Sequence, residues 1–270
     1  MKKLKVGIVG CGVIGTSIAL ACRTRLAHAV ELSGICDIDK NKILALNRSL
    51  KKKTRALKLD QLIKKSDLVV EASSSLVSSR IIEKCVKNKK DCLIMSVGGL
   101  LGRERLLKKA LERGVKVYIP SGAVCGIDAL KAASVGKITS VTLTTRKPPK
   151  GLEGAPYLAS KGIDVNAIIE ETILFEGSAG DAVKGFPANV NVSAVLSLAG
   201  IGAANTRVRI VTSPDYKRNV HEVEIIGDSG RITTRTENVP SESNPKTSAL
   251  AIYSAIATLE GIVKSVRIGT

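Results

Sequence analysis

The chain has 270 residues, 44% hydrophobic and 24% charged, which is typical of a globular protein with one large domain or two modest ones. No apolar run approaches the ~20 residues that would span a bilayer. The formal net charge of +18 makes nucleic acid or anionic membrane a partner to consider. However, the basic residues are spread along the chain and aromatic residues make up only 2%, so no base-stacking surface is expected. We therefore expect neither nucleic acid nor membrane as a partner.

The cysteines show no C-x-x-C pair and no metal-type spacing. Several of them lie in apolar segments, and all lie in the first half of the chain. This pattern favours buried, reduced thiols, a cytoplasmic protein and no metal site. The six cysteines are Cys11, Cys22, Cys36, Cys85, Cys92 and Cys125.

A glycine-rich turn follows the first apolar strand, residues 6–9, and leads into a helix-like apolar pattern. In a G-x-G-x-x-G turn the first glycine permits the tight bend, the second lets the backbone approach a pyrophosphate, and the third allows close helix packing. The N-terminus of the following helix would present N–H groups to the phosphates. The candidate phosphate-binding residues are Gly10, Gly12, Val13, Ile14 and Gly15.

An acidic residue follows this turn at the distance that a dinucleotide site requires. The segment 30–39 indicates a second strand that ends at Asp37, about 20 residues beyond the last glycine. A carboxylate there binds the adenosine ribose hydroxyls and should repel the extra phosphate of NADP. The sequence therefore favours NAD, with NADP still open. The alternative is a structural glycine turn in an unrelated α/β sheet.

Alternating helices and strands continue to residue 120. The apolar strand in 67–75 closes in small polar residues, and Ser73 joins the cofactor candidates because ligands bind at the carboxyl ends of such strands. Further helices over 76–89 and 103–113 alternate with apolar strands. This pattern predicts a dinucleotide-binding Rossmann domain, a doubly wound parallel sheet, over residues 1–120.

From Ser121 the pattern becomes α+β. An alternating strand ends at Pro148 and Pro149, and three successive strands fill residues 206–239. These features predict a second domain over 121–243 with a mixed or antiparallel sheet. We expect a final helix over 244–270, capped by Ser243 or Asn244 with Pro245 in its first turn, whose position allows packing on the first domain.

Histidine is scarce. His28 falls at a predicted surface turn and is expected to be structural. Strand alternation puts His221 on the same face as Val223 and Ile225. On spacing alone His221 is more typical of a core residue. Beside a cofactor domain, however, it is the side chain best suited to take a proton near neutral pH.

Cys125 offers a different chemistry, because it follows the last strand of the first domain in a Gly-flanked loop. A thiolate there, with His221 as base, would make a thiol-dependent aldehyde dehydrogenase. A small packed residue in a tight loop is the simpler interpretation, since no neighbour in the sequence suggests a lowered thiol pKa. A non-catalytic dinucleotide sensor also stays open.

Besides the glycine turn, five stretches in order along the chain carry specific motifs: residues 119–130, 142–149, 174–194, 219–225 and 237–254. Together they resemble the NAD(P)-dependent L-aspartate dehydrogenases. The resemblance implies a Rossmann domain, an α+β catalytic domain and a homodimer. It also implies that His221, in Asn219-Val220-His221, is catalytic and that Ala123 and Asn189 contact the cofactor.

The reaction that this resemblance implies is hydride transfer from the α-carbon of L-aspartate to NAD(P). The product, iminoaspartate, would hydrolyse to oxaloacetate and ammonia or feed quinolinate and NAD biosynthesis. The two substrate carboxylates require cationic or N–H donors. The sequence offers 42 Lys and Arg and does not single out which of them bind substrate.

Overall fold

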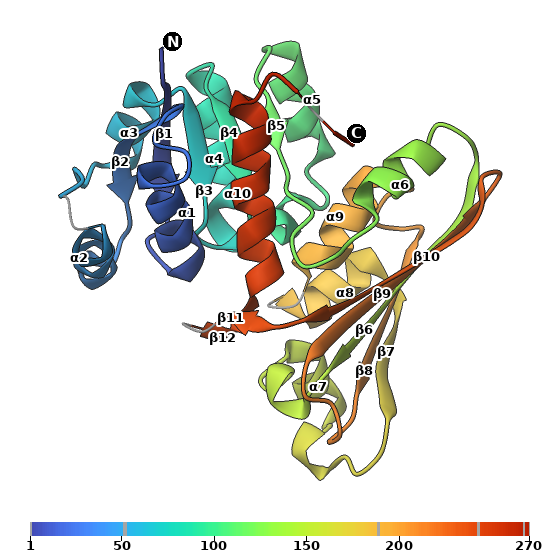
Figure 1. The fold of residues 1–270 in the computed structure, drawn as a ribbon. Coiled ribbons are helices and arrows are strands. Elements are labelled where there is room, and N and C mark those ends of the chain that lie inside the picture. The colour runs from blue at the N-terminus through green and yellow to red at the C-terminus, as the bar shows by residue number, and fades with distance from the viewer. Residues whose placement is uncertain (1, 51–52, 188–189, 242–243, 267, 270) are drawn as a thin grey trace. The chain divides into compact units, whose positions relative to one another are not determined.

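The computed structural model describes residues 2–50, 53–187, 190–241, 244–266 and 268–269. The chain forms two compact units, drawn in Figure 1. Unit 1 comprises Met1–Pro120 and Ile252–Arg267, and unit 2 comprises Ser121–Ala251 and Ile268–Thr270.

Unit 1 is built on a five-stranded sheet in the order β2-β1-β3-β4-β5, with every pair parallel. The strand order reverses at β1, so the carboxyl ends of β1 and β3 form the switch point where such sheets bind ligands. β3 is buried along its whole length, as expected for a strand covered on both faces. The strands are β1 (Leu4–Val9), β2 (Val30–Cys36), β3 (Leu68–Glu71), β4 (Asp91–Ile94) and β5 (Val117–Tyr118).

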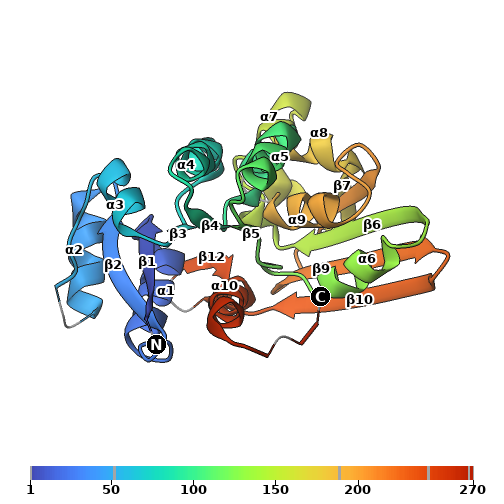
Figure 2. The same ribbon diagram turned by 90° about the horizontal axis from the view of Figure 1, so that it is seen from above.

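Helices cover both faces of this sheet. Figure 2 shows α3 and α4 on one side and α1 and α10 on the other. Leu259 of α10 packs in one core cluster with Ile8 and Ile18. The predicted doubly wound parallel sheet is confirmed. The helices are α1 (Val13–Arg23), α2 (Lys40–Ser49), α3 (Leu59–Lys65), α4 (Ser75–Lys87), the 3-10 turn η1 (Val97–Leu100), α5 (Glu104–Glu112) and α10 (Ala249–Val263).

Unit 2 contains a second five-stranded sheet, in the order β10-β9-β6-β8-β7. β6 and β8 run parallel and the other neighbours run antiparallel, so the predicted mixed sheet is confirmed. Alternation along each strand divides the side chains between two faces. The strands are β6 (Ile138–Lys147), β7 (Thr172–Ser178), β8 (Thr206–Thr212), β9 (Asn219–Gly227) and β10 (Gly230–Asn238).

The two faces of this second sheet differ in character. On one face, Leu143 and Val223 share a core with Leu196 of α9 and other helix residues. The opposite face carries cross-strand ion pairs, among them Arg209–Glu176, whose charged atoms are 3.0 Å apart. His221 therefore lies on the face that helices cover. The short helices are α6 (Ile127–Ala133), η2 (Pro149–Gly151), α7 (Pro156–Lys161), η3 (Val165–Ala167), α8 (Ala179–Gly185) and α9 (Asn191–Ala199).

The final helix begins later than the sequence predicts. Residues 244–248 form strand β12 (Asn244–Ser248), paired with β11 (Pro240–Ser241), and the predicted helix start at residue 244 is wrong. The Ser248 hydroxyl accepts a hydrogen bond from the backbone N–H of Leu250 at 3.2 Å and so starts the helix five residues on. Ser243 lies outside the described residues. Within the described ranges, no helix is both long and apolar enough to cross a membrane.

Candidate active site

The glycine turn after β1 is shaped by contacts that only glycine permits. Gly10 has φ +97°, and a Cβ on it would lie 2.3 Å from the carbonyl oxygen of Ala72. A Cβ on Gly15 would lie 1.9 Å from the carbonyl oxygen of Gly10. At Gly12, by contrast, a Cβ would meet nothing within 4 Å. The turn is thus packed at its two ends and open at the glycine where a pyrophosphate would approach.

Helix α1 begins at this open position. Gly12 is its N-cap and provides no side-chain cap, and Val13 and Ile14 form the first turn. First-turn N–H groups have no acceptor within their own helix and carry the positive end of its dipole. The residues present therefore fit the phosphates of a dinucleotide.

Asp37 lies beside the glycine turn at the end of β2. One of its carboxylate oxygens accepts a hydrogen bond from the backbone N–H of Cys11 at 2.7 Å, and the other accepts one from Asp39 at 2.9 Å. These bonds fix the carboxylate at the carboxyl edge of the sheet, next to the turn. The structure thus brings Asp37 together with the glycines.

Ser73 lies at the same edge, and a buried carboxylate that the sequence analysis missed holds it there. Glu71, the last residue of β3, is fully buried. Its carboxylate accepts hydrogen bonds from the backbone N–H and hydroxyl of Ser73, at 2.7 and 2.8 Å. The backbone N–H and the hydroxyl of Ser96, which follows β4, also donate to the Glu71 carboxylate, each at 2.9 Å. Glu71 therefore fixes the chain after β3 and after β4 at the switch point. In the sequence, a charged residue in an apolar strand was the signal that could have identified Glu71.

His221 is the third residue of β9, lies on the helix-covered face of the sheet in unit 2, and is only 4% exposed. Its Nδ1 is 3.1 Å from the hydroxyl oxygen of Thr145, the residue directly opposite on β6. Burial, followed by the positive charge of Lys147, lowers the pKa of His221 to about 3. The imidazole is therefore neutral at physiological pH, with one ring nitrogen tied to a hydroxyl.

Lys147 is a second charged side chain near a candidate site residue that the sequence analysis did not single out. It is half-buried at the end of β6, two residues beyond Thr145, and thus lies on the same face as His221. Burial lowers the pKa of Lys147 to about 8. No local pattern in the sequence singles out Lys147, because its place beside His221 follows from the pairing of β6 with β9.

Ala123 lies in the loop that opens unit 2, and two polar residues hold that loop. Its carbonyl oxygen accepts a hydrogen bond from the side-chain amide of the buried Asn238 at 3.0 Å. The amide oxygen of Asn238 in turn accepts one from the Ser248 hydroxyl at 2.6 Å. The backbone of Ala123 is thus fixed against the end of β10. Asn189 lies outside the described residues.

Among the described contacts, none joins a cysteine thiol to His221, whose Nδ1 contacts Thr145. Cys125 is half-buried, and its backbone carbonyl oxygen accepts a hydrogen bond from the Thr234 hydroxyl. Burial raises the pKa of Cys11 to about 12. In the parts of the chain that the structure describes, no group of three or more His, Cys, Asp or Glu could hold a metal ion. His28 is exposed at a turn, as predicted.

Comparison with known proteins shows where this arrangement belongs. Residues 128–262 match the family model "Aspartate dehydrogenase, C-terminal", and residues 10–120 match "Homoserine dehydrogenase, NAD binding domain". An L-aspartate dehydrogenase of Methanosarcina acetivorans is 48% identical, with 99% of this chain and 100% of the relative covered. The chain belongs to the aspartate dehydrogenase family. The resemblance stated from the sequence is thereby confirmed.

One further curated relative and two solved structures are also similar to this member of the aspartate dehydrogenase family. An L-aspartate dehydrogenase of Bradyrhizobium diazoefficiens is 41% identical, with 99% of this chain and 95% of the relative covered. The crystal structure of aspartate dehydrogenase from Thermotoga maritima aligns with a TM-score of 0.75 at 26% identity, covering 99% and 100% of the two chains. Scyllo-inositol dehydrogenase from Lactobacillus casei, solved with NAD(H), shares the fold at a TM-score of 0.56 and 17% identity, covering 99% of this chain and 92% of that one.

Proposed function

We propose that this chain is an NAD(P)-dependent L-aspartate dehydrogenase. The observation that carries the proposal is the match to L-aspartate dehydrogenases over 99% of the chain, at 41% to 48% identity. The structure adds a glycine turn suited to a dinucleotide in unit 1 and a neutral, buried histidine in unit 2. The first can hold the hydride acceptor and the second can take the proton, and amine oxidation by hydride transfer requires both functions.

The proposed cofactor site is formed by the residues at the switch point of unit 1. Gly12 leaves room for the pyrophosphate, the first turn of α1 supplies N–H groups, and Asp37 accepts hydrogen bonds from the adenosine ribose. Ser73 lines the same edge. We assign to unit 2 the contacts at Ala123 and at Asn189, the latter through its side-chain amide. In this proposal residues 1–120 are the dinucleotide-binding domain, and residues 121–243 are the catalytic and dimerisation domain.

The proposed chemistry centres on His221. When bound, the nicotinamide supplies the acceptor for the hydride that leaves the α-carbon of L-aspartate. His221 takes the accompanying proton, from the amine or from the water that hydrolyses iminoaspartate to oxaloacetate and ammonia. For Nε2 to accept that proton, Nδ1 must carry the ring hydrogen and donate it to the Thr145 hydroxyl oxygen. In that tautomer the Thr145 hydroxyl accepts the hydrogen bond from Nδ1 and Nε2 is left to act as the base.

We favour NAD over NADP, because the Asp37 carboxylate would face the additional 2′-phosphate of NADP. We further propose a cytoplasmic homodimer whose iminoaspartate feeds quinolinate and NAD biosynthesis. Light scattering tests the homodimer. A molar mass equal to that of one chain at micromolar concentration would rule out the dimer.

The substrate and cofactor are tested by mixing purified protein with NAD or NADP and a panel of amino acids and aldehydes, and following reduced-cofactor absorbance. We expect turnover with L-aspartate, a higher kcat/KM with NAD than with NADP, and the same turnover in Cys125→Ala. Reduction of NAD by an aldehyde but by no amino acid would contradict the proposal. Binding of NAD with no turnover of any compound would instead favour the non-catalytic dinucleotide sensor.

The alternatives to an amino-acid dehydrogenase receive no support. The family match gives the aldehyde dehydrogenase no support, and none of the described contacts pairs the Cys125 thiol with His221. The sensor has no feature in its favour either, since the buried His221 and its hydroxyl partner are the groups that proton transfer requires.

A further inference from the structure

Lys147 and His221 lie on neighbouring strands of unit 2 and on the same face of the sheet. Thr145 is directly opposite His221, and Lys147 is two residues further along β6, a spacing that returns the side chain to the same face. Asn219 is two residues before His221 on β9. A Cβ on Gly151 would be 3.9 Å from the amide oxygen of Asn219 and 3.9 Å from the Cβ and Cδ of Lys147. Lys147 and Thr145 of β6 thus lie on the same face of the sheet as His221 and Asn219 of β9.

Lys147 also lines a small, largely apolar cavity between β6, β8 and the helices. Besides Lys147, its polar lining side chains are Thr145 and Ser193. An ammonium close to apolar side chains attracts an anion more strongly than one in bulk water, because the local dielectric constant is lower. The remaining lining residues are Leu143, Leu152, Ala182, Val190, Val208 and Ile210.

We propose that Lys147 binds one carboxylate of the substrate beside His221 and so selects a dicarboxylic amino acid. The inference rests on the proposed function, because it assumes that the substrate carries two carboxylates. An ammonium that donates to a carboxylate forms a charge-assisted hydrogen bond, about twice as strong as a neutral one. An amino acid with an uncharged side chain forms one such bond fewer, and the site rejects it.

The same contact adjusts the strength of the base. The positive charge of Lys147 lowers the pKa of His221. A carboxylate bound at Lys147 offsets that charge, so the pKa of His221 rises when the substrate is in place. His221 therefore becomes a stronger base in the complex than in the free protein.

The charge on Lys147 also sets a pH limit on binding. Its pKa of about 8 means that carboxylate affinity falls as the pH rises above that value. His221 on β9 is the titratable group that faces it. On the packed elements nearby, Lys150 of η2 is exposed, and Asp181 and Lys184 of α8 are exposed and paired with each other at 3.2 Å.

Succinate, a dicarboxylate without the reacting amine, provides a test that does not require turnover. We would measure its dissociation constant by calorimetry in the presence of NAD, for the parent, Lys147→Gln, Lys147→Arg and the control Lys150→Gln. We expect affinity to fall roughly 10- to 100-fold in Lys147→Gln and to stay unchanged in Lys150→Gln. Above pH 8 the parent should lose affinity, approaching about tenfold per pH unit, while Lys147→Arg should hold its affinity.

Equal succinate affinity in the parent and Lys147→Gln would overturn the inference, as would a pH profile shared by the parent and Lys147→Arg. For L-aspartate, Lys147→Gln should show a raised KM and a weaker preference over L-alanine. A parent that reduces NAD with L-aspartate while Lys147→Gln does so equally well would refute only the inference. A parent that never reduces NAD with L-aspartate would refute the proposed function itself.

Discussion

At the scale of single residues, the chemistry depends on a pair that joins two distant parts of the sequence. Thr145 and His221 are 76 positions apart, and the register of β6 against β9 places them opposite each other. The hydroxyl is buried with the imidazole. Because water does not replace a lost partner in such a place, the hydrogen bond matters more than a surface bond would.

Replacing Thr145 by Val keeps the side-chain shape and removes the acceptor for Nδ1. We expect kcat with L-aspartate to fall roughly 10- to 100-fold, because the tautomer with a basic Nε2 loses its stabilising bond. The dissociation constant for NAD should not change. Steady-state kinetics and a cofactor titration measure the two quantities.

Thr145→Ser is the matched control, since it restores the hydroxyl while removing a methyl group. Its kcat should lie closer to that of the parent than the kcat of Thr145→Val. If the serine and valine variants lost the same activity, packing rather than the hydrogen bond would explain the loss.

At the scale of elements, two glycines of the turn between β1 and α1 are expected to govern different properties, one the stability of the fold and the other the affinity for the cofactor. Gly15 packs against the carbonyl of Gly10, whereas Gly12 faces open space in the structure. Two substitutions of the same size, three residues apart, thus test different properties.

Gly12→Ala should change the free energy of unfolding by less than about 0.5 kcal/mol while weakening NAD binding roughly tenfold or more, because the methyl group occupies the space for the pyrophosphate. Gly15→Ala should lower the free energy of unfolding by roughly 1–3 kcal/mol, because its Cβ overlaps backbone. Urea denaturation measures the free energy of unfolding of each variant, and a titration with NAD measures its cofactor affinity. Unaltered NAD affinity in Gly12→Ala would place the cofactor elsewhere.

Elements with a strong periodic pattern were predictable from the sequence, and elements that depend on pairing were not. The alternation in β9 correctly places His221, Val223 and Ile225 inside. Pro245, by contrast, fits the first turn of a helix as well as an edge strand, and pairing between β11 and β12 determines the outcome. The helix start was therefore wrong by five residues.

The site was predictable where one segment carries it. The glycine turn and Asp37 could be identified, because a local spacing defines them. Thr145 and Lys147 could not, because their role depends on which strand lies beside β6. A sequence with 42 Lys and Arg gives no means to choose one cation without that register.

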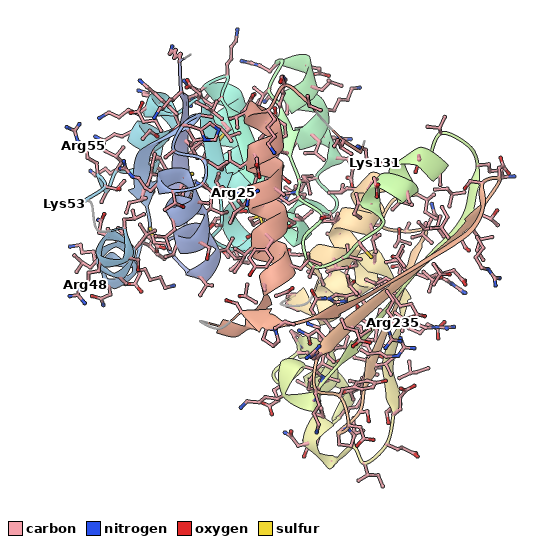
Figure 3. All side chains as sticks on the ribbon, viewed as in Figure 1. Arg25, Arg48, Lys53, Arg55, Lys131 and Arg235 are labelled. Carbon is pink, nitrogen blue, oxygen red and sulfur yellow. The ribbon has the colours of Figure 1, made fainter. Side chains whose placement is uncertain are left out.

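At the scale of the whole molecule, the positive charge is distributed over both units. Figure 3 labels Arg48 on α2, Lys131 on α6 and Arg235 on β10, and side chains of both signs accompany them. The net charge of +18 attracts anions in general, and a dinucleotide and a dicarboxylate are both anions. Selectivity must then come from placed groups such as Asp37 and Lys147.

The central claim is that unit 1 binds the dinucleotide and that His221 of unit 2 is the base. The most direct test compares the parent with His221→Gln in NADH formation from L-aspartate, with NAD affinity measured on the same samples. We predict that the substitution lowers kcat by roughly 100-fold or more and leaves the NAD dissociation constant unchanged. Parent-like kcat in His221→Gln, with NAD still bound, would contradict the account.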